Sequence, residues 1–134
     1  MYEAGMELID ELNKQEARSI LQYKECVYKA AVSHAKDCER RKIMAHEGSD
    51  GKQPWDRILK ECSSLTEGNE NLAGAAGENP RLPVINLLLD DGISSRGHRY
   101  NMLDAKWIYV GCTSYVMERT SYYTMLGWVQ NFAY

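Results

Sequence analysis

Three histidines are the residues of this sequence best suited to acid–base or metal chemistry: His34, His46 and His98. His46 and His98 both stand in glycine-containing stretches that indicate loops, 46-HEGSDGKQ-53 and 94-SSRGHRYNML-103. Loops on a rigid scaffold carry a large share of ligand-binding side chains. His34 falls instead on the apolar face of a predicted helix, which favours a core histidine with one satisfied hydrogen bond.

Acidic side chains accompany the two loop histidines: Glu47, Asp50, Glu70, Asp90 and Asp91. Two neutral imidazoles with one or two carboxylates match the donors of a tetrahedral zinc site, in which water fills the open position. The sequence has no compact ligand spacing such as H-E-x-x-H. A hydrolase triad of Ser94 or Ser95 with His98 and an aspartate lacks the G-x-S-x-G elbow. Spacing alone therefore does not decide whether these residues form a zinc site, form a hydrolase triad or have only a structural role.

Composition narrows the class of protein. A chain of 134 residues with 44% apolar residues can bury one sizeable core, so we expect a single domain over residues 1–134. The formal charge of −3 gives no electrostatic footprint for nucleic acid. The apolar runs fall short of the roughly 20 residues of a membrane helix. The start, 1-MYEAGMELIDEL-12, lacks the features of a secretory leader, so either the protein stays inside the cell or a leader has been removed.

The four cysteines are even in number but widely scattered: Cys26, Cys38, Cys62 and Cys112. They form no C-x-x-C pair, which argues against a zinc knuckle or a redox motif. Four cysteines allow three pairings, and the sequence does not choose among them. The alternative to disulfide bonds is that all four cysteines are free and act as small buried hydrophobic residues.

Apolar periodicity predicts the elements that must position these side chains. Helical spacing covers residues 2–18, 24–42, 54–64 and 82–92. The turn-rich stretch 66–80 predicts a long connection. Two segments rich in Tyr, Trp, Val and Thr, 107–117 and 122–133, predict a β-hairpin. Helices followed by strands predict an α+β fold with an antiparallel sheet covered by helices.

The order of the motifs is more specific than any one of them. The chain contains, in this order, 30-AAVSHAKDC-38, 46-HEGSDGKQPWDRI-58, 70-ENLAG-74, 90-DDGISSRGHRYNML-103 and 110-VGC-112. This series resembles the CAP superfamily, or SCP domains, which includes cysteine-rich secretory proteins, antigen 5 and pathogenesis-related proteins. It is most similar to the compact branch of bacteria and protists, over nearly the whole chain. The resemblance implies a three-layer α-β-α sandwich with a small, mainly antiparallel sheet between helices.

The same resemblance implies a cleft that carries two histidines and two acids. His46, Glu70 and His98 match three of these positions, and Asp91 best matches the fourth, with Asp90 as the other choice. An aspartate there, where glutamate is more usual, shortens the reach of the side chain by one methylene. His34 matches a position that family members often fill with tryptophan, which agrees with a core role.

Family membership would imply export, disulfide bonds and binding rather than turnover. We therefore predict a secreted binding protein whose tetrad holds a divalent metal, zinc by its donors, and whose partners are a lipid, a sterol or another small hydrophobic ligand, or a protein. Two alternatives remain open at this point: a metal-assisted, protease-like hydrolase, and a protein-interaction domain with a relic tetrad.

Overall fold

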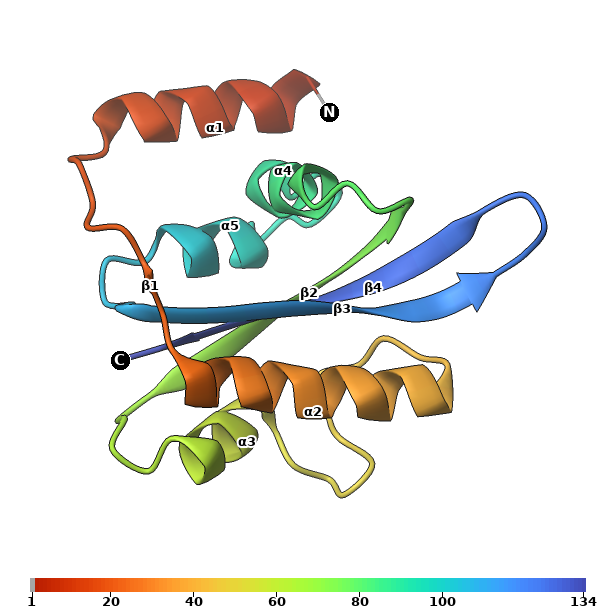
Figure 1. Cartoon of the computed structure of the whole chain (residues 1–134). Coiled ribbons are helices and arrows are strands. Elements are labelled where there is room, and N and C mark those ends of the chain that lie inside the picture. Colours follow the sequence, from red (N-terminus) through yellow and green to blue (C-terminus); the bar gives the residue numbers. More distant parts are fainter. Residues whose placement is uncertain (1) are drawn as a thin grey trace.

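The structure, a computed structural model, describes residues 2–134 and has three layers. Two helices, α2 (Glu25–Arg41) and α3 (Pro54–Glu61), cover one face of a central sheet (Figure 1). Three others, α1 (Tyr2–Lys14), α4 (Arg81–Leu89) and α5 (Gly97–Leu103), lie on the opposite side. The predicted α-β-α sandwich is confirmed.

The sheet has the strand order β1-β3-β4-β2. Its centre is the hairpin of β3 (Tyr109–Arg119) and β4 (Thr124–Ala133), as predicted. β2 (Gly68–Ala76) pairs antiparallel with β4 along its whole length, and the two-residue β1 (Gln22–Tyr23) pairs parallel with β3. β2 is therefore an edge strand.

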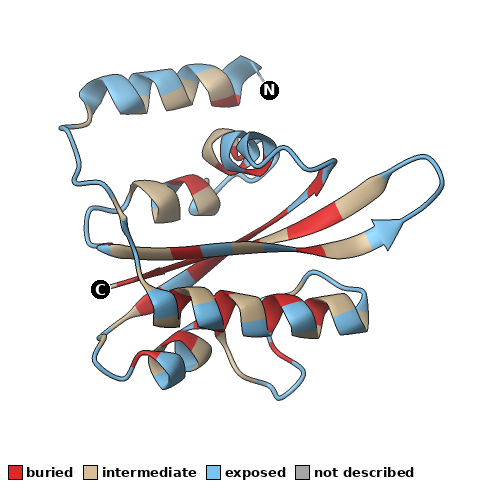
Figure 2. Cartoon of the chain, viewed as in Figure 1, coloured by how far each residue is buried: buried red, intermediate tan, exposed pale blue. Residues whose placement is uncertain are grey.

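Small residues let α2 lie close against the sheet. Its inward face buries Val27, Ala30, Ala31, Ala35 and Cys38, the stripe that the helical spacing predicts, and Figure 2 shows this buried face turned to the strands. On β3, a Cβ added to Gly111 would lie 2.4 Å from the backbone nitrogen of Tyr28. No larger residue fits there without moving the helix.

The prediction of a long turn-rich connection over 66–80 is wrong, because residues 68–76 form β2. Glycine, asparagine and alanine have low strand propensity, but propensity in sheets yields to packing and pairing. Here Leu72, Ala73 and Ala75 are buried between layers.

Helix α4 ends earlier than the predicted Gly92, because Asp90 already has a left-handed φ of 48°.

One disulfide joins two helices of the same layer. Cys26, in the first turn of α2, is bonded to Cys62, directly after α3. Cys38 and Cys112 are free thiols, the first of them buried. This settles the pairing that the sequence leaves open. Among residues 2–134 no helix is both long and apolar enough to cross a membrane.

Candidate functional site

The first half of the site is a histidine–aspartate pair at the junction of α4 and α5. Asp90 is buried, and its Oδ1 lies 2.8 Å from Nδ1 of His98. Its Oδ2 accepts the backbone N–H of the same histidine at 2.9 Å. The sequence indicated a loop here, but His98 is the second residue of α5. Asp90 can reach the histidine because its left-handed backbone turns the chain at the end of α4.

The two arginines of the 94–103 motif hold this turn in place. Arg99 donates from Nε to the carbonyl of Leu88 at 2.7 Å and from Nη2 to that of Leu89 at 2.8 Å. Arg96 donates from Nη1 to the carbonyl of Asp90 at 2.7 Å. The last carbonyls of a helix have no partner within it, so these guanidinium groups satisfy them and fix the direction of the chain.

The same arginines fasten α1 to the rest of the domain. Arg99 is fully buried and also donates to the carbonyl of Ala4 at 2.9 Å and to Glu11 at 3.3 Å. Arg96 donates to Glu7 at 2.8 Å and thereby lowers the pKa of that carboxyl. The N-terminal helix is thus bound to the turn that presents His98.

The second half of the site is a histidine–glutamate pair. Nδ1 of His46 lies 3.0 Å from Oε1 of Glu70, which is buried on β2. Oε2 of the glutamate accepts Nη2 of Arg57 at 3.0 Å. In the amide orientation that satisfies its own contacts, Asn131 donates to the same oxygen at 3.2 Å. The buried charge of Glu70 is therefore compensated on both oxygens, as a buried carboxylate requires.

The two pairs approach the edge strand β2 from opposite layers. Glu70 contacts the layer of α2 and α3, whereas its neighbour Asn71 donates to the carbonyl of His98 at 3.1 Å and accepts Nδ2 of Asn101, on α5, at 2.9 Å. Three of the four residues predicted for the tetrad, His46, Glu70 and His98, are therefore in these two pairs. Of the two aspartates, Asp90 contacts His98, whereas Asp91 is exposed.

The chemistry of both pairs is the same. A carboxylate only accepts hydrogen bonds, so the ring proton of each histidine is on Nδ1 and Nε2 keeps its lone pair. Among residues 2–134, neither Nε2 has a hydrogen bond. A carboxylate behind a histidine fixes the tautomer and the orientation of the ring, the usual arrangement behind metal-binding imidazoles. The pairs are suited to bind a metal or to accept a proton at Nε2.

A small apolar pocket of about 110 Å³ lies between α4 and the sheet. Its walls include Pro83, Val84 and Leu87, and its floor includes Trp128 and Gln130. The indole Nε1 is buried without a hydrogen-bond partner in the described chain. Sequence reasoning missed this pocket. The available signal was the lack of a polar face on α4, RLPVINLLL.

Comparison with known proteins identifies one family over most of the chain. The profile of the cysteine-rich secretory protein family, CAP, matches residues 7–132. No curated protein sequence is similar enough to count as a match.

Solved structures agree in fold. An outer surface protein of Borrelia burgdorferi superposes with a TM-score of 0.64 at 20% identity, covering 95% of this chain and 84% of that one. An extracellular SCP-domain protein of Bacillus anthracis gives 0.62 at 20% identity, over 92% of this chain and 35% of that one. The CAP domain of enterococcal PrgA gives 0.53 at 20% identity, over 95% and 58%.

Proposed function

This chain belongs to the CAP family of cysteine-rich secretory proteins, and we propose that it is a secreted binding module whose His46 and His98 hold a divalent metal ion, zinc by preference. The observation that carries the proposal is the pairing of each imidazole with a buried carboxylate through Nδ1, at 3.0 Å and 2.8 Å. Both rings are thereby oriented with a nitrogen lone pair free, as neutral histidine ligands must be.

The donor set limits how the metal would be held. No group of three or more His, Cys, Asp or Glu side chains in residues 2–134 has the arrangement of a metal site. Glu70 and Asp90 are committed to their histidines, so the protein would supply two nitrogens and water or a ligand would supply the rest. We expect weaker binding than at a closed structural site of four protein ligands.

A small hydrophobic molecule is the proposed second ligand, in the pocket beside α4. An apolar chain would contact Val84 and Leu87, above a floor that includes Trp128 and Gln130. Pockets of this kind combine apolar walls with few polar groups, which set orientation. The pocket volume suits a short acyl segment or one edge of a ring system.

Calorimetric titration with zinc chloride tests the metal site. We expect saturable binding at pH 7.5 that is lost in the His46→Ala/His98→Ala protein. Asp90→Asn should weaken binding about tenfold or more, because an outer partner of a ligating histidine is worth about that much. Asp91→Asn is the matched control and should bind as the wild type does. Equal weakening by both variants, or no zinc binding by the wild type, would refute the proposed site.

Fluorescence of cis-parinaric acid, a polyene fatty acid, tests the pocket. Binding should be saturable and should be abolished by Val84→Trp, which fills the space beside α4. Binding that survives this substitution would place the fatty acid elsewhere.

Secretion is supported by the Cys26–Cys62 disulfide, since such bonds persist in oxidising compartments. A mass two hydrogens below that of the reduced chain, in protein exported by its native host, tests that part.

A further inference from the structure

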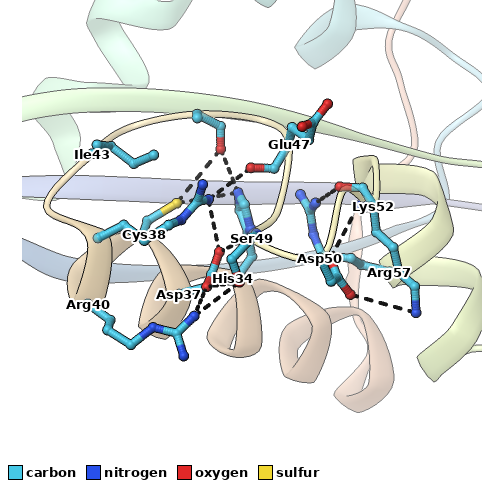
Figure 3. Close-up of polar contacts among 12 residues, drawn as sticks. His34, Asp37, Cys38, Arg40, Ile43, Glu47, Ser49, Asp50, Lys52 and Arg57 are labelled. Atoms are coloured by element: carbon cyan, nitrogen blue, oxygen red, sulfur yellow. Dashed lines mark hydrogen bonds and ion pairs between the residues drawn. The ribbon is translucent and has the colours of Figure 1, made fainter.

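We propose that His34 is a positioning residue that sets both the backbone and the carboxylate partner of His46. The inference rests on the proposed function, because it assigns His34 a role in the same site. Figure 3 shows His34 and Cys38 on α2, facing the segment of residues 43–47 that carries His46. We call residues 43–47 the His46 segment.

The first contact that supports this role is with the backbone. Nε2 of His34 lies 2.7 Å from the carbonyl oxygen of Ala45, the residue directly before His46. A carbonyl only accepts, so Nε2 carries the proton and donates. The imidazole is 1% exposed, so no water competes for this bond.

The second contact is with the partner of His46. The same Nε2 atom lies 3.7 Å from Oε1 of Glu70, the oxygen that holds Nδ1 of His46. One N–H group therefore faces both the peptide that precedes His46 and the carboxylate that orients its ring. A shift of His34 would change both halves of the pair together.

Other side chains fix the same segment at its two ends. Tyr115, buried on β3, donates its hydroxyl to the carbonyl of Ile43 at 3.0 Å. Arg41 donates from Nη2 to the carbonyl of Glu47 at 2.8 Å. The segment has no helical or strand pairing of its own, so these bonds take the place of a regular backbone ladder.

The other ring nitrogen shows that core packing does not explain the residue. Nδ1 of His34 is buried and has no hydrogen-bond partner in the described chain. A buried polar atom without a partner destabilises a fold, and an apolar residue of similar volume would avoid that cost. We infer that the imidazole is kept for the contacts of its Nε2 atom, although its unpaired Nδ1 lowers the stability of the fold. Such a loss of stability is common at functional sites.

The test compares His34→Leu, which removes the donor, with His34→Gln, whose amide can donate to Ala45. The readouts are the zinc dissociation constant, the backbone order parameters of residues 44–47 from NMR relaxation, and the melting temperature. Val27→Ala is the control, since Val27 is buried on α2 in a cluster with Ile58 and Cys62, away from the His46 segment.

We expect His34→Leu to raise the zinc dissociation constant about tenfold and to lower the order parameters of residues 44–47, with the melting temperature unchanged or higher. His34→Gln should restore most of both, and Val27→Ala should lower only the melting temperature. Unchanged order parameters in a folded His34→Leu protein would overturn the proposal.

Two further outcomes are decisive. If the wild type binds no zinc, the proposed metal site fails, but the order parameters still test the positioning role by themselves. If His34→Leu does not fold, His34→Met, which also lacks a donor to the Ala45 carbonyl, replaces it. Unchanged order parameters of residues 44–47 in that variant would overturn the positioning role.

Discussion

The disulfide between Cys26 and Cys62 makes the sharpest prediction about stability. It closes a loop with a sequence separation of 36 residues. In the chain-entropy account, a cross-link over a loop of this size removes about 13 cal/mol/K from the unfolded chain, or about 4 kcal/mol at 25 °C. Replacing both cysteines by alanine should therefore lower the free energy of unfolding by about 4 kcal/mol.

The same loss of free energy of unfolding predicts a large shift in melting temperature. A chain of 134 residues has an unfolding entropy of about 0.28 kcal/mol/K, so the loss corresponds to about 14 °C. Urea unfolding followed by circular dichroism gives the free energy, and calorimetry gives the midpoint. Dithiothreitol should lower the stability of the wild type by a similar amount and leave the double variant unchanged, because Cys38 and Cys112 are already free.

A loss below about 1 kcal/mol in the double variant would refute this reasoning. It would mean that α2 and α3 are already held together in the unfolded ensemble, so that the bond removes little chain entropy. A further loss on adding dithiothreitol to the double variant would show that Cys38 and Cys112 form a bond that the structure does not contain.

Three further predictions concern single residues. Burial lowers the pKa of His34 below its usual value of about 6.5, so the unfolded chain binds the proton first, and stability should fall below about pH 6.5 by up to about 1.4 kcal/mol per pH unit. Urea unfolding at pH 7.5 and 5.5 should show this fall, and an equal fall in His34→Gln would contradict it. Gly111→Ala should cost about 2 kcal/mol or more, because the new Cβ would lie 2.4 Å from the nitrogen of Tyr28; a melting temperature equal to that of the wild type would show that α2 moves freely. Arg99→Leu should cost about 3 kcal/mol by leaving Glu11 and three carbonyls without their donor, and a smaller loss in chemical unfolding would show that water reaches them.

Local patterns predicted the elements that carry a strong periodicity. The small-residue face of α2 is visible in the spacing of Val27, Ala30, Ala31 and Ala35, and the structure buries all four. The β-hairpin follows from β-branched and aromatic residues around 118-ERTS-121. In both cases one element contains its own signal, so neighbours are not needed to recognise it.

The elements that the sequence concealed depend on partners. β2 is composed of glycine, asparagine and alanine with few other residues, and it becomes a strand because β4 pairs with it. The choice between Asp90 and Asp91 depends on a left-handed backbone at the end of α4, which two distant arginine contacts stabilise. The order of the motifs identified Asp90 and Asp91 as the two candidates. Only the backbone geometry shows that Asp90 is the partner of His98.

The pairing of β2 with β4 also decides which histidine receives a glutamate. Glu70 and Asn71 are consecutive, and strand side chains alternate between faces, so a slip of one residue would direct the amide to His46 and the carboxylate to α5. Gly68 resists such a slip, since a Cβ there would lie 2.8 Å from Ile58 of α3. The register of β2, which Gly68 helps to fix, therefore determines that the Glu70 carboxylate lies on the side of His46 and the Asn71 amide on the side of α5.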